Sequence, residues 1–72
     1  MTEVAERRAR LRAVADGVLT LPPEQRAALV LREFQGLSYE EVAQVLGVSL
    51  AAVKGRIHRA RLRLIEVIAG WE

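Results

Sequence analysis

The sequence has 72 residues, of which 51% are hydrophobic and 28% are charged, with a formal net charge of +2. This composition is typical of a small globular domain; a disordered chain is excluded, and no apolar run approaches the ~20 residues of a membrane span. Because the chain has no cysteine and one histidine, we expect neither a metal nor a cofactor, and so short a chain leaves little room for an enzyme pocket.

The N-terminal half of the chain predicts two helices. The periodicity of apolar residues predicts the first helix over residues 3–19. Its apolar face is formed by Leu11, Val14, Ala15 and Val18. The Leu21-Pro22-Pro23 segment ends this helix, because proline disfavours helix at the residue before it and suits the first turn after it. The second helix is predicted over residues 23–35, and its buried stripe consists of Ala27, Val30, Leu31 and Phe34.

The C-terminal half predicts a short helix and a long one. Ser38 and Glu41 have the spacing of a capping box, which predicts a short third helix over residues 39–46. Ser49 is the next N-cap candidate, and the fourth helix is predicted over residues 50–69. No segment shows strand alternation, so the sequence predicts an all-α fold of four helices.

The junction of the last two helices has the spacing of a helix-turn-helix, in which the second helix enters the DNA major groove. Ala43 is small where the second helix must approach closely, and Gly47 supplies the turn. Leu46, Val53 and Ile57 are predicted to be buried at the centre of the motif. An ordinary αα-hairpin explains the apolar positions, but it does not explain the basic helix that follows. The predicted fold class is therefore an all-α, four-helix single domain over residues 1–72 that ends in a helix-turn-helix.

The basic residues are segregated along the chain. Five of the eleven basic residues fall within ten positions that contain no acid, namely Lys54, Arg56, Arg59, Arg61 and Arg63. A second group near the N-terminus consists of Arg7, Arg8, Arg10 and Arg12. Such a segment is typical of a surface that binds polyanions, usually nucleic acid, although a solvated helix face has the same composition.

A helical wheel of the fourth helix separates a core side from an exposed side. The core side consists of Leu50, Val53, Ile57, Ala60, Leu64, Val67, Ile68 and Trp71. The exposed side of the first turns consists of Ala51, Lys54, Gly55, His58 and Arg59, with Arg61 and Arg63 beside them. Small residues let the helix approach a groove wall, and Lys54 and Arg59 are long enough to reach guanine or a phosphate. Leu62 and Ile65 lie off the core side, which indicates either a partner surface or tolerated apolar exposure.

Five segments form an ordered series: Leu21–Arg26, Leu29–Arg32, Gly36–Ala43, Leu46–Ser49 and Val53–Arg61. At these spacings the series resembles the C-terminal region four of bacterial sigma-70 family sigma factors, and within that family the extracytoplasmic-function class. The resemblance implies a tetrahelical or winged-helix-like module that binds double-stranded promoter DNA at the −35 element during transcription initiation. It also implies binding to the β flap of the RNA polymerase core and to an anti-sigma factor.

The resemblance also implies roles for individual residues. Base or backbone contacts are implied for Lys54, Gly55, His58 and Arg59, and phosphate contacts for Ser49, Ala51, Ser38, Tyr39 and Glu40. The remaining basic residues of the fourth helix, Arg56, Arg61 and Arg63, are predicted to bind DNA as well. The partner-binding candidates are Leu29, Leu62 and Ile65. At Gly55 and His58 the chain departs from the serine and the aromatic or leucine that the family often has, which affects the base preference and not the fold.

Two other functions fit parts of the pattern. A LuxR-type response-regulator output domain is also four-helical, but the Leu-Pro-Pro-Glu-Gln-Arg entry and the Arg-Ala-Arg run favour a sigma factor. An interaction module would bind polymerase or an anti-sigma factor and rarely DNA. The region two of sigma factors, which melts promoters, is not in this chain, so the chain is either a fragment or a stand-alone region-four-like protein. We expect a cytoplasmic protein without membrane association, because Thr2, Glu3 and Glu6 are unlike a signal peptide.

Overall fold

The computed structural model describes residues 2–71, and in this range it contains helices and no strand. The elements in chain order are α1 (Glu3–Thr20), α2 (Pro23–Leu29), η1 (Val30–Phe34), α3 (Tyr39–Leu46) and α4 (Leu50–Trp71). Because η1 continues α2 directly, the chain has the predicted all-α, four-helix architecture, in its tetrahelical form. In the described range, no helix combines the length and the apolar character needed to cross a membrane.

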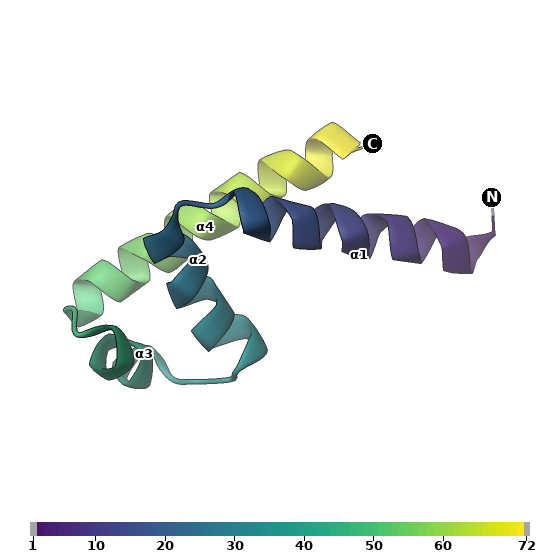
Figure 1. Ribbon diagram of the computed structural model, residues 1–72. Coiled ribbons are helices and arrows are strands. Elements are labelled where there is room, and N and C mark those ends of the chain that lie inside the picture. Colours follow the sequence, from purple (N-terminus) through teal and green to yellow (C-terminus); the bar gives the residue numbers. More distant parts are fainter. Residues whose placement is uncertain (1, 72) are drawn as a thin grey trace.

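The long helix α4 organises the arrangement (Figure 1). α1 and α2 both pack against α4, and α3 packs against the start of α4. The first half of α1 extends past the C-terminal end of α4, so the molecule is elongated, with extents of 45 × 20 × 14 Å.

Local signals fix most helix ends. The Oγ of Ser38 accepts the Glu41 N–H at 3.1 Å while the Glu41 carboxylate accepts the Ser38 N–H at 2.9 Å, which is the predicted capping box. Gly47 ends α3 with a φ of 66°, in the left-handed region that glycine tolerates best. The Oγ of Ser49 accepts the Ala52 N–H at 3.0 Å at the start of α4, as its position predicts.

The second helix ends in a wide π-turn that the sequence pattern did not predict. In η1 the Gln35 N–H bonds to the Val30 carbonyl at 3.1 Å, five residues back. The prediction that Phe34 belongs to the buried stripe is wrong, since this side chain is 66% exposed. An extra residue in the turn changes the register of the last side chains relative to α-helical spacing. The residues that α2 buries are Ala28 and Leu29 instead.

The core consists of two clusters, both completed by α4. The first joins α1 and α2 to the middle of α4 and contains Val18, Leu21, Leu29 and Ala60, with Val30 and Leu64 packed against it. The second is the core of the helix-turn-helix and contains Ala28, Val42, Val53 and Ile57, with Leu31, Leu37, Tyr39, Ala43, Leu46 and Val48 packed against it. The predicted burial of Val53 and Ile57 is confirmed, whereas Leu46 is only partly buried.

Two predicted apolar faces are shorter in the structure than in the sequence pattern. Leu11 and Ala15 of α1 are exposed, and the first half of α1 lies beyond the helices that could cover it. On α4, Leu50 and Ile68 are also exposed, at the two ends of the stripe. The side chain of Trp71, which was predicted on the same stripe, lies outside the described residues.

α1 crosses α4 at a glycine. A Cβ placed on Gly17 would lie 3.1 Å from Leu64 Cδ2 and 3.2 Å from Val67 Cγ1. The absence of a side chain at this buried position therefore leaves room for the Leu64 and Val67 side chains of α4 to pack against α1. Packing against α4 therefore explains why α1 contains Gly17, a residue with low helix propensity.

Candidate nucleic-acid interface

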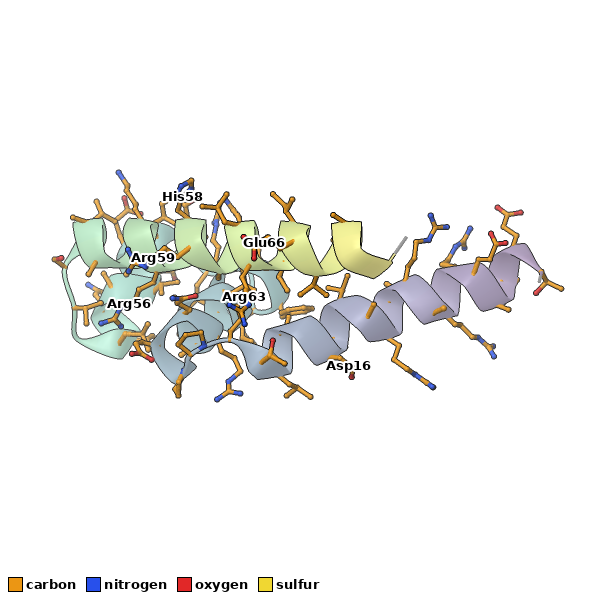
Figure 2. All side chains as sticks on the ribbon, turned by 90° about the horizontal axis from the view of Figure 1, so that it is seen from above. Asp16, Arg56, His58, Arg59, Arg63 and Glu66 are labelled. Carbon is orange, nitrogen blue, oxygen red and sulfur yellow. The ribbon has the colours of Figure 1, made fainter. Side chains whose placement is uncertain are left out.

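The burial of two side chains fixes how α4 is rotated about its own axis. Val53 and Ile57 are 0% and 1% exposed in the core of the helix-turn-helix. The side chains on the opposite face of the same turns are therefore turned outward. Ala51, Lys54 and His58 are exposed there, and Figure 2 shows His58 on the side of α4 that faces away from the other helices.

This outward face is basic and has little bulk at its centre. Ala51 and Gly55 are small and lie one turn apart, with Lys54 and His58 in the same turns. From Leu50 to Ile65 the helix contains no acidic residue. A helix with this face can bring its backbone close to a polyanion while long cationic side chains reach past it.

Arg59 lies across Gly55. A Cβ added at Gly55 would stand 3.1 Å from Arg59 Nη1 and 3.7 Å from its Cζ, so the guanidinium rests where a side chain at position 55 would be. Gly55 thereby leaves room for the Arg59 side chain to lie along the helix. Because Arg59 is exposed, it can also turn outward toward a ligand.

The remaining cations of α4 lie on its flanks. Figure 2 shows Arg56 and Arg63 on the side of α4 turned toward the other helices. Arg63 is exposed and Arg56 is partly buried. With Pro22 and Gln25 at the start of α2, Arg59 and Arg63 line a shallow depression that also includes Leu62 and Glu66. The predicted DNA-binding side chains are thus divided: Lys54 and His58 lie on the outward face of α4, whereas Arg59 and Arg63 line its flank next to α2.

Among the cations of α4, and within the described residues, Arg61 is the one that forms an ion pair. Its Nη2 donates a hydrogen bond to Oε1 of Glu33 in η1, and the two side chains are 47% and 42% exposed. The Glu33 carboxylate is the main reason that the pKa of Arg61 is raised, with a smaller contribution from the Tyr39 hydroxyl. Glu33 is not identifiable as the partner of Arg61 from the sequence, since the two residues are 28 positions apart and no local pattern connects them.

The start of α3 is occupied by its own hydrogen bonds and packing. Ser38 caps the helix, and its backbone N–H and its hydroxyl both lower the pKa of Glu41. The ring of Tyr39 packs against the helix-turn-helix core and lies under Arg32, whose Cζ is 4.7 Å from the ring centroid. Glu40 is exposed beside them. Ser38, Tyr39 and Glu40, the three residues predicted to contact a phosphate near α3, therefore lie together at the start of this helix. Ser38 and Tyr39 also stabilise the fold, through the helix cap and core packing.

The partner-binding candidates separate into two groups. Leu62 and Ile65 are 48% and 61% exposed on the C-terminal half of α4, so their placement off the core side is confirmed. Leu29 is 2% exposed and belongs to the cluster that joins α1, α2 and α4. Leu29 is therefore not available on the surface to bind a partner as the sequence predicted, because α4 crosses α2 over this side chain.

Three known proteins with similar sequences are all named as sigma factors. The chain is 54% identical over 50 residues to the ECF RNA polymerase sigma factor SigE of Mycolicibacterium smegmatis, a match that covers 69% of this chain and 20% of that protein. It is 39% identical over 66 residues to the RNA polymerase sigma-E factor of Streptomyces coelicolor, covering 92% of this chain and 37% of that protein. It is 43% identical over 68 residues to the ECF RNA polymerase sigma factor SigM of Mycobacterium tuberculosis, covering 90% of this chain and 35% of that protein.

The chain thus spans between 20% and 37% of the length of these relatives. A family description, Sigma-70, region 4, matches residues 11–64. This range runs from the middle of α1 to the residue of α4 that packs on the first core cluster, so it contains both clusters and the helix-turn-helix. The resemblance predicted from the sequence is confirmed, and the chain belongs to the Sigma-70, region 4 family.

Proposed function

We propose that this chain is the region-four module of an extracytoplasmic-function sigma factor, which binds double-stranded promoter DNA at the −35 element during transcription initiation. The observation that carries the proposal is the outward face of α4. It is basic, it lies directly opposite the buried Val53 and Ile57, and it follows the left-handed turn at Gly47. A helix-turn-helix presents its second helix to the major groove in this way.

The proposed contacts follow from where each side chain emerges. Lys54 and Arg59 project from the N-terminal half of α4, which enters the groove, so they are assigned to base edges. Ala51 and Gly55 allow the close approach, and His58 lies beside them on the same face. On the flank, Arg56 and Arg63 are assigned to the phosphate backbone, together with the α4 N-terminus at Ser49.

The whole protein is proposed to act with RNA polymerase, which the names of the relatives mention, and to do so in the cytoplasm. Exposed Leu62 and Ile65 are the apolar residues through which α4 would contact the polymerase β flap or an anti-sigma factor. Apolar side chains that remain exposed next to a charged surface are typical of protein-interaction sites. The function is one of binding and recruitment, without catalysis. The family match does not favour a LuxR-type output domain.

Competition titrations with two single substitutions test the proposal. Arg59→Ala removes a proposed base contact, so it is expected to weaken binding to a −35-like duplex by ~1–3 kcal/mol and to reduce the preference over a scrambled duplex. Arg63→Ala removes a proposed phosphate contact, so it is expected to weaken binding to both duplexes alike and to lower the salt slope by about one. The titrations need low salt, because a module this small buries a limited interface.

Two outcomes would contradict the proposal. A wild-type chain that binds both duplexes equally has no sequence preference to explain. Equal losses of affinity for both variants on both duplexes would mean that α4 binds DNA only as a basic patch, without base recognition.

A further inference from the structure

The guanidinium of Arg61 joins α4, the second helix of the helix-turn-helix, to η1, which continues α2. The side chain leaves α4 and its Nη2 donates to the Glu33 carboxylate of η1. Glu33 is also the main reason that the pKa of this guanidinium is raised. Arg61 therefore links α4 to η1 by an ion pair at the protein surface.

Arg32, the residue before Glu33 in η1, makes contacts with the start of α3. Its guanidinium lies 4.7 Å from the centroid of the Tyr39 ring, and its Nη1 donates to the carbonyl of Leu37 at 2.9 Å. The Tyr39 ring and Leu37 both pack against the helix-turn-helix core. Consecutive residues of η1 thus bind the start of α3 through Arg32 and the middle of α4 through Glu33.

Arg63 provides the contrast on the same helix. It is exposed, and within the described part of the chain it forms no ion pair with a carboxylate. Arg61 is held beside a negative charge that a DNA phosphate would repel. The two arginines, both predicted as DNA contacts from the sequence, therefore differ in their surroundings.

We propose that Arg61 is a positioning residue that links α4 to η1 through Glu33, and so sets the angle at which α4 meets DNA, instead of contacting phosphate itself. This inference rests on the proposed DNA-binding function.

The two roles predict opposite effects when Glu33 is neutralised. If Arg61 contacted phosphate, Glu33→Gln would free its guanidinium and remove a negative charge near the DNA, so affinity would rise. If Arg61 positions α4, Glu33→Gln removes half of the link, so the preference for the −35-like duplex falls as it does for Arg61→Gln. The salt slope is unchanged in both variants, because no phosphate contact is lost.

The experiment titrates a −35-like and a scrambled duplex with the full 72-residue chain over a range of salt concentrations. The variants are Glu33→Gln, Arg61→Gln and their combination, with Arg63→Gln as the matched control on the same helix. Each single variant of the pair is expected to lose about two- to fivefold of the preference, the size typical of an exposed ion pair, and the combination is expected to lose no more. Arg63→Gln alone is expected to lower the salt slope by about one.

A charge exchange separates the pair from the overall charge. Glu33→Arg combined with Arg61→Glu keeps the net charge, so it is expected to recover the preference that each exchange alone abolishes. Tighter binding by Glu33→Gln, a lower salt slope for Arg61→Gln, or no recovery in the exchanged variant would each overturn the inference.

A wild-type chain without any preference for the −35-like duplex would refute the proposed function instead. In that case urea unfolding of the same variants without DNA decides whether the link exists. Non-additive losses of stability support the link between η1 and α4, and additive losses overturn it.

Discussion

The burial of Leu29 gives the sharpest test of the packing. Leu29 is 2% exposed between α2 and α4, whereas Leu62 on α4 is 48% exposed, so one substitution can be compared at two leucines. Removing the buried side chain loses its transfer free energy and leaves a cavity, which together cost ~2–5 kcal/mol. A chain of 72 residues has a total stability of only about 4–11 kcal/mol, so Leu29→Ala removes a large part of it.

The assay is thermal and urea unfolding, followed by circular dichroism of the helices. For a domain of this size we expect Leu29→Ala to lower Tm by ~10 °C or more, and Leu62→Ala to leave it within a few degrees. Leu29→Asp is expected to prevent folding, because it places a carboxylate in the cluster that joins three helices. If Leu29→Ala and Leu62→Ala have the same Tm, the assignment of Leu29 to the core is refuted.

Two further predictions concern the ends of α3. Gly47→Ala is expected to lower the free energy of unfolding in urea by about 1 kcal/mol, because φ is 66° and no atom lies within 4 Å of the added Cβ, so the cost comes from the backbone alone. Gly47→Asn is expected to cost less. Equal stability of the wild type and both variants would contradict this backbone cost. The pKa of Glu41 is lowered by hydrogen bonds from Ser38, so its ionised form stabilises the fold above the ordinary carboxyl pKa of 4.5, and this stabilisation is lost as pH falls through the lower pKa of the folded state. We therefore expect the wild type to be more stable than Glu41→Ala at pH 7, and this difference to shrink in acid. A difference that persists unchanged at low pH would show that the ionised carboxylate of Glu41 does not contribute to the cap.

The sequence by itself determined the helices and the turn between α3 and α4. Proline after Leu21, the Ser38–Glu41 pair and Gly47 act on backbone within a few residues, so their effects are present in the local pattern. The burial of Val53 and Ile57 was also predictable, because they repeat at helical spacing next to that turn. These signals, together with the ordered motifs, were enough to predict the fold class and the family.

Only the tertiary structure decided which apolar residues are covered. Helical periodicity indicates that a face is apolar, but the position at which another helix crosses it depends on the whole chain. Leu29 is therefore buried where α4 crosses α2, while Leu11 remains exposed beyond the crossings and Phe34 is exposed at the π-turn that ends the second helix. Gly17 reads as a weak helix residue until the approach of α1 to Leu64 is known.

The same distinction applies to the candidate interface. The sequence grouped Arg61 with Arg63 and the other cations, because charge and spacing are all that a local pattern contains. The structure separates them, since folding brings Glu33, 28 residues away, to the side chain of Arg61. An ion pair between distant segments depends on three-dimensional placement, so the sequence determined where positive charge gathers and the tertiary structure decided which charges remain available to a ligand.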